Sequence, residues 1–204
     1  MSNNVMTPVG VLCFPHLFEP AGNKQNPAQE KRYSCILLFD KLATESTKYK
    51  ELRAAVQAAA AEKWGEAKAA DPAFMRSLRL PFRPAAEKDY GGFEKGEIYI
   101  NPWSSAKNAP PQVVDVRGTE INVPSDVWAG QKARATVRAF AYDSNGNRGV
   151  SFGLEHVQIV KQDEPRIDGR RSATDAFANA DNSEFAAHGI DPNASSSPSG
   201  DAPW

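Results

Sequence analysis

Two arginines and two aromatic residues alternate along Arg134 to Tyr142 (RATVRAFAY). Successive side chains of a strand point to opposite faces, so one face carries Arg134, Thr136, Arg138, Phe140 and Tyr142. Small apolar residues fill the other face. Guanidinium groups bind phosphates and aromatic rings stack on unpaired bases, so this face predicts a surface for single-stranded nucleic acid. The alternative is an amphipathic strand packed beneath a helix, with its arginines reaching out to solvent.

Three other places interleave basic and aromatic residues. They are Arg32 with Tyr33, the group Arg79, Arg83, Lys88, Tyr90 and Phe93, and Tyr99 with Trp103. Arg32, Tyr33, Arg83, Tyr90 and Trp103 are therefore further candidates for nucleic-acid binding, although ordinary core or surface residues would give the same pattern. The glycines after Tyr90 allow either a mobile loop or a plain turn.

The sequence offers no set of residues that predicts catalysis or a cofactor. It lacks a P-loop, a GxSxG elbow and an HExxH motif. Cys13 and His16 with Cys35 are the best metal candidates. Residues three apart on a strand face opposite ways unless a bulge intervenes, and no second ligand pair exists. We therefore expect no enzyme, no metal and no cofactor, and we expect both cysteines to be buried thiols.

The net charge of −1 hides a strong asymmetry along the 204 residues. Residues 172–204 hold five acids and no Lys or Arg, so this segment carries −5 and the remainder carries +4. A basic body with an acidic tail favours a nucleic-acid partner. The chain has no apolar run of ~18 residues and no signal-like start. We therefore expect no membrane association and a cytoplasmic location, in the host cell if a phage encodes the chain.

The hydrophobic patterns predict a mainly β protein with one long helix. Residues 9–18 form a strand with an edge or a bulge at Pro15, and residues 32–39, apolar on both faces, form a central strand. A helix follows over 44–70 and ends at Asp71-Pro72. Its apolar stripe, at helical spacing, consists of Tyr49, Leu52, Val56, Ala59, Ala60 and Lys63/Trp64. The remaining expected elements are a strand at 97–101, a hairpin over 113–123, and a hairpin that pairs 134–142 with 149–160 across a turn.

These elements favour an OB-like five-stranded barrel with an inserted long α-helix and a disordered acidic C-terminal tail. The barrel is predicted for residues 1–165 and the flexible tail for 166–204. From about Asp181 onward, Ser, Asn, Asp, Gly and Pro dominate the sequence. Such a composition buries too little apolar surface to fold.

Several local motifs resemble the single-stranded DNA-binding proteins of tailed bacteriophages, an OB-fold family. The matching stretches are FPHLFEP (14–20), KRYSCILLFDK (31–41), YGGFEKGEIYINP (90–102), AYDSNGNRGVSFGLEHVQIVK (141–161) and RRSATDAF (170–177). The resemblance implies a protein that coats and protects single strands, without sequence preference, during phage DNA replication and recombination. Weaker binding to duplex DNA and assembly into a homo-oligomer are alternatives that the sequence leaves open.

The same resemblance implies a tail that docks replication or recombination proteins through acids and a terminal aromatic residue. Asp201, Pro203 and Trp204 would serve here, although the last ten residues hold a single acid. The alternative function is an OB-fold protein-interaction module, such as a virion or replication-complex assembly factor, that does not bind DNA directly.

Overall fold

The computed structural model describes residues 4–22, 26–90, 92–93, 96–144, 146–167 and 188–189. Contacts along the chain separate two units, residues 1–169 and residues 170–204. The described strands and helices all lie in the first unit. Asp201, Pro203 and Trp204, and all of the predicted tail except residues 166–167 and 188–189, fall outside the described residues.

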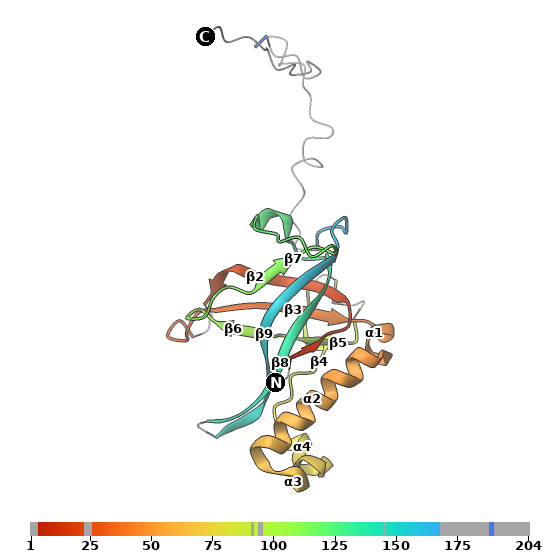
Figure 1. The fold of residues 1–204 in the computed structure, drawn as a ribbon, viewed down its shortest axis with the longest axis vertical. Helices are drawn as coiled ribbons and strands as arrows, with labels where there is room; N and C mark the ends of the chain where they lie inside the picture. Colours follow the sequence, from red (N-terminus) through yellow and green to blue (C-terminus); the bar gives the residue numbers. More distant parts are fainter. Residues whose placement is uncertain are drawn as a thin grey trace. The chain divides into compact units, whose positions relative to one another are not determined.

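The described strands form one sheet that closes on itself (Figure 1). Its order is β1-β8-β2-β3-β6-β9-β7, and β8 also pairs with β9, which closes a ring of β2, β3, β6, β9 and β8. All pairings within the ring are antiparallel except β6 with β9. The strands are β1 Asn4–Met6, β2 Gly10–Ala21, β3 Arg32–Phe39, β4 Arg83–Pro84, β5 Ile98–Ile100, β6 Trp103–Ser105, β7 Gln112–Val114, β8 Lys132–Ser144 and β9 Asn147–Lys161. The five-stranded barrel is therefore confirmed.

Strand β3 is central because both of its faces are apolar. Leu37 and Phe39 point into the main core inside the barrel. Ile36 and Leu38 point to a second, smaller core on the outer face of β2, β3 and β5, together with Cys13, Ala85, Phe93 and Tyr99. The outer face of these strands is thus built over a hydrophobic layer of its own.

The helical segment lies between β3 and β4. One long helix was predicted there, but the segment is divided into four shorter helices. The pieces are α1 Lys41–Glu45, α2 Thr47–Trp64, α3 Glu66–Ala70 and α4 Pro72–Ser77. Ser46 caps α2 through its hydroxyl, which accepts the Tyr49 N–H at 3.2 Å. Gly65, at φ 91°, ends α2 in a conformation that favours glycine. Asp71 does end a helix as predicted, but it also caps α4.

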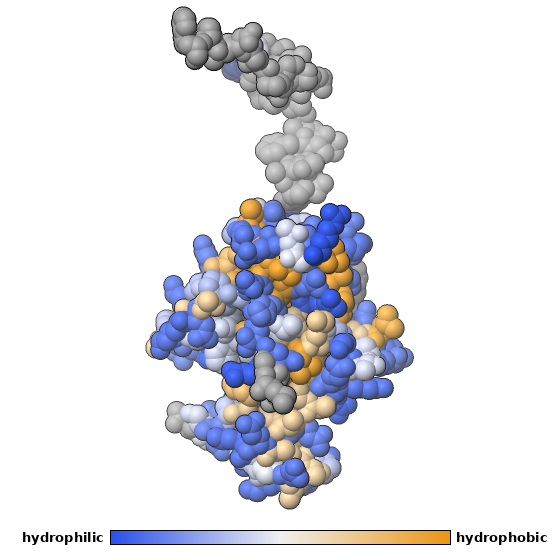
Figure 2. Space-filling model, viewed as in Figure 1, coloured by the Kyte–Doolittle hydropathy of each residue, from blue (hydrophilic) through white to orange (hydrophobic). Residues whose placement is uncertain are grey.

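Helix α2 packs its predicted stripe against the barrel. Tyr49, Leu52, Val56, Ala59 and Ala60 are buried in the main core. The opposite side of α2 is rich in alanine, and its surface shows as pale orange in the space-filling view (Figure 2). The helix therefore covers the barrel on the side opposite to the basic side chains of β8, as the alternating pattern requires.

The cysteines lie on different faces of the sheet. Cys13 belongs to the outer core and Cys35 to the inner one, and both are free and buried. Burial raises the pKa of each thiol to about 12, so neither is a reactive thiolate at neutral pH. Among the described residues, no three His, Cys, Asp or Glu side chains gather as a metal site, and no helix is long and apolar enough to cross a membrane.

Candidate nucleic-acid interface

Strand β8 has the two faces that its alternating sequence predicts. Ala133, Ala135 and Val137 are buried in the core, whereas Arg138 is exposed and Phe140 is half-buried. Ala139 lines a groove between β1, β8 and α2. Phe140, the next residue of the strand, therefore faces away from the helix. The apolar face of β8 therefore packs toward α2 while Arg138 points outward, an arrangement that both interpretations of this strand share.

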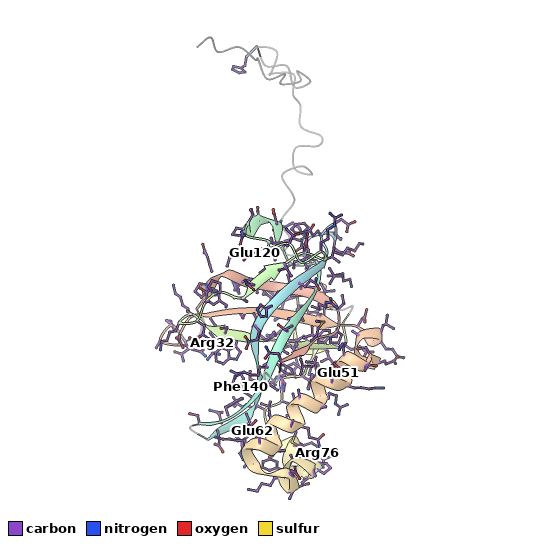
Figure 3. All side chains as sticks on the ribbon, in the orientation of Figure 1. Arg32, Glu51, Glu62, Arg76, Glu120 and Phe140 are labelled. Atoms are coloured by element: carbon purple, nitrogen blue, oxygen red, sulfur yellow. The ribbon has the colours of Figure 1, made fainter. Side chains whose placement is uncertain are left out.

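Trp103, on β6, is the centre of the cluster that this face forms. The Arg32 guanidinium carbon lies 3.7 Å from the centre of the indole ring. Phe140 meets Trp103 in an edge-on contact with ring centres 5.9 Å apart, and the indole N–H donates to the Ser151 hydroxyl at 3.1 Å. Three strands thus hold the indole in one orientation, and Figure 3 marks Arg32 and Phe140 on their strands.

A shallow pocket of about 340 Å³ lies beside Trp103, which forms part of its wall. Its walls include Arg83, Tyr99 and Tyr142, together with Arg79, Leu80, Pro81, Asn101, Trp103, Val150 and Ser151. Arg83 and Tyr99 face each other in the register of β4 and β5. The structure therefore brings together five residues expected to bind nucleic acid: Arg32, Arg83, Trp103, Phe140 and Tyr142. Arg138 extends this set on the exposed part of β8.

The arginines of this cluster stand apart from the ion pairs of the described residues. Among the described residues, none of the ion pairs involves Arg32, Arg83 or Arg138. The Arg32 Nε is buried without a hydrogen-bond partner, and desolvation lowers the pKa of its guanidinium despite the opposing charge of Glu30. Burial also raises the pKa of the Tyr99 hydroxyl, with Glu87 adding to the shift and Arg83 opposing it. The site thus carries cations with unused hydrogen-bonding capacity.

Three residues expected at the interface are not part of the Trp103 cluster. Arg134 donates from Nε to the Gln158 side chain at 2.7 Å, so its guanidinium is already engaged. Tyr33 is 8% exposed and offers no ring face to a ligand. Tyr90 is exposed, but it belongs to a separate aromatic group with Phe14 and Phe93. Neither Phe14 nor Ser151 was expected from the sequence, because a lone aromatic or hydroxyl on a strand carries no signal.

Close packing at Gly149 holds the pocket together. The segment after α4 runs beside β9, where the Arg79 N–H donates to Arg148 O and the Val150 N–H donates to Arg79 O. A Cβ at Gly149 would lie 2.3 Å from Arg79 O and 2.8 Å from the Tyr142 hydroxyl. Only glycine allows these two walls to approach so closely.

We therefore expect Gly149→Ala to lower the free energy of unfolding by about 1–3 kcal/mol, the usual cost of overpacking. Gly153→Ala in the same strand is the control, because its Cβ would meet nothing closer than 3.6 Å. Urea unfolding of both variants measures the difference. Equal stability of the two variants would show that the contact between Arg79 and β9 is not tight.

The closed barrel with a basic and aromatic outer face defines the class of this protein as an OB-fold protein, a barrel that binds oligonucleotides or oligosaccharides in many proteins. The family model described as "Enterobacter phage Enc34, ssDNA-binding protein" matches residues 3–186. The chain belongs to this family. The expected family resemblance is thereby confirmed.

Solved structures of phage proteins share the fold. The single-stranded DNA-binding protein from bacteriophage Enc34 in complex with ssDNA superposes with a TM-score of 0.63 at 19% identity, covering 80% of this chain and 89% of that chain. A second structure of the bacteriophage Enc34 protein gives a TM-score of 0.62 at 20% identity, covering 86% of this chain and 90% of that chain. Gp2.5, a single-stranded DNA-binding protein of bacteriophage T7, gives 0.54 at 17%, with 83% and 97% covered. No curated protein sequence matches the chain.

Proposed function

We propose that this protein binds single-stranded DNA without sequence preference and coats it during phage DNA replication and recombination. The family to which the chain belongs supports this proposal. The observation that carries it is the cluster of Arg32, Trp103 and Phe140, in which a cation and two rings are held at fixed geometry on the outside of the barrel.

In this proposal the arginines contact phosphates and the aromatic rings stack on bases. Arg83 and Arg138 are exposed and free of ion pairs among the described residues, so they are suited to follow a backbone. Trp103 and Tyr142 line the pocket next to them. Every base has a ring face, so stacking combined with phosphate contacts gives affinity without sequence readout.

The protein acts, in this proposal, by binding alone and not as an enzyme, in the cytoplasm of the host cell. Residues 166–204 form the tail, and Asp201, Pro203 and Trp204 dock replication or recombination proteins.

The first two residues after the predicted domain end still pack on the barrel. The Ile167 N–H donates to Ala129 O at 3.0 Å, and Arg166 lies over the Trp128 ring. Duplex DNA would bind more weakly, since its bases are already stacked.

Deleting residues 172–204 tests the tail. This segment carries −5 against +4 for the remainder, so we expect the truncated protein to bind labelled oligo-dT more tightly, most clearly at low salt. Fluorescence anisotropy measures the dissociation constant of both forms. Equal or weaker affinity after truncation would contradict a role of the tail as an internal competitor of DNA.

The same assay on the full chain separates DNA binding from the alternative of a protein-interaction module. A DNA-coating protein binds oligo-dT with an affinity that falls as salt rises. An interaction module that does not bind DNA gives no anisotropy change at micromolar protein and low salt. That result would overturn the proposed function.

A further inference from the structure

An irregularity in β2 places Phe14 on the outside of the barrel. Cys13 pairs with Ile36 and His16 with Ser34, so β2 holds one more residue than β3 over this stretch. An extra residue reverses which face the following side chains occupy. Leu12 and Leu17 consequently both point into the core, and the bulge expected at Pro15 is confirmed.

Phe14 lies in this bulge with an unfavourable backbone conformation and an exposed side chain. Its φ of 47° is the one positive value found at a described residue other than glycine, a conformation that bulky side chains rarely adopt. Phe14 is also 43% exposed, so burial does not compensate for the backbone strain. Strained residues of this kind concentrate at functional sites.

Phe14 and Tyr90 form an exposed pair of rings. Their centres are 5.1 Å apart in an edge-on arrangement, and Tyr90 is 53% exposed. Behind them lies the buried Phe93, with its ring centre 6.5 Å from that of Phe14 and 6.1 Å from that of Tyr90. The Lys88 ammonium lies 5.9 Å from the Tyr90 ring centre. A cation beside two exposed rings repeats the chemistry of the Trp103 cluster.

Tyr99 connects the two aromatic groups. Its ring is 5.8 Å from that of Phe93, and it also lines the pocket that contains Trp103. Trp103 lies four positions after Tyr99 along the chain, which is at most ~14 Å of extended backbone. OB folds cover roughly 4–16 nucleotides. One strand of DNA is therefore long enough to reach both groups.

We infer that Phe14 and Tyr90 form a second platform on which a base of single-stranded DNA stacks, with Lys88 contacting the adjacent phosphate. This inference rests on the proposed function and extends the DNA path from the Trp103 cluster across Tyr99 to the bulge of β2. The strain at Phe14 is retained because the ring acts on the ligand and not on the fold.

The variant Phe14→Gly tests the platform, because glycine relieves the positive φ while it removes the ring. We expect the dissociation constant for an oligo-dT of about 16 nucleotides to rise ~5- to 50-fold, since stacking of one base is lost. The unfolding temperature should fall by no more than about 3 °C. Tyr90→Ala should weaken binding similarly, and the double variant should fall short of the product of the two effects, since the rings act as one platform.

Val123→Ala is the matched control, since Val123 is also an exposed apolar residue, at 52%, but lies before 3₁₀-helix η3 (Pro124–Asp126) in the segment between β7 and β8. Wild-type affinity of Phe14→Gly, with Trp103→Ala impaired, would overturn the platform and leave the proposed function intact. Absence of binding by the wild-type protein would overturn the proposed function itself.

Photo-crosslinking on the unaltered protein gives an independent readout that does not depend on the folding of a variant. An oligo-dT carrying 5-iododeoxyuridine is irradiated with the protein, and the adducts are mapped by mass spectrometry. We expect adducts at Phe14 or Tyr90 in addition to the Trp103 cluster. Adducts confined to the Trp103 cluster would overturn the platform.

Discussion

Trp103→Ala is expected to weaken the binding of oligo-dT by about 10- to 100-fold. Stacking of a base on an aromatic ring contributes about 1–3 kcal/mol, which corresponds to ~5- to 150-fold in affinity. The substitution also removes the ring on which Arg32 lies and which Phe140 contacts. Both neighbours lose their fixed positions, so we place the effect above the lower end of this range. Fluorescence anisotropy at fixed salt measures it.

Trp128→Ala provides a closely matched control. Trp128 is also half-buried, its indole N–H donates to Glu164 O at 3.0 Å, and Arg166 lies over its ring. The two tryptophans thus have the same kinds of contact, but Trp128 is outside the proposed interface. An equal loss of affinity in both variants would mean that the effect of Trp103→Ala comes from general disruption of the fold.

The double variant Arg83→Glu with Arg138→Glu is expected to show the second large effect. Both side chains are exposed, so the substitutions disturb little of the core. Each phosphate contact to a single strand contributes roughly 0.7 to the slope of log K against log salt. Losing two contacts should lower that slope by ~1.4, and the added repulsion should weaken binding about 100-fold or more at 50 mM salt.

Arg53→Glu with Arg117→Glu makes the same change in net charge away from the cluster. Arg53 lies on α2 and Arg117 in the turn after β7, and both are exposed. We expect this variant to keep most of the affinity and the full salt slope. Similar losses in the two double variants would show that net charge, and not the arrangement of the arginines, determines binding.

The sequence predicted most of the fold because alternation and turn signals are strong in this chain. Strand β3 was located at its observed bounds, and the stripe of α2 was identified down to Tyr49, Leu52 and Val56. The helix was predicted as one piece because the composition stays helical across Gly65. Its left-handed backbone, which breaks the helix, is not visible in hydrophobic periodicity.

The candidate site was less predictable, because it depends on which strands become neighbours. Alternation in β8 correctly separated Arg138 and Phe140 from the core. The contact of Trp103 with Phe140 follows from the closure of the barrel between β6, β9 and β8, which no local pattern encodes. Tyr33 is buried because its strand is covered on both faces, so an aromatic residue beside a basic one does not by itself indicate an exposed ring.

An NMR titration of the indole N–H signals with oligo-dT tests whether single-stranded DNA binds at the Trp103 cluster. Trp103 donates its indole N–H to Ser151 within the proposed interface, whereas Trp64 packs on Phe74 and Trp128 contacts Glu164. We expect a saturable shift of the Trp103 signal, with those of Trp64 and Trp128 nearly unchanged. Binding of the oligonucleotide with an unmoved Trp103 signal would place the DNA elsewhere and contradict the proposed interface.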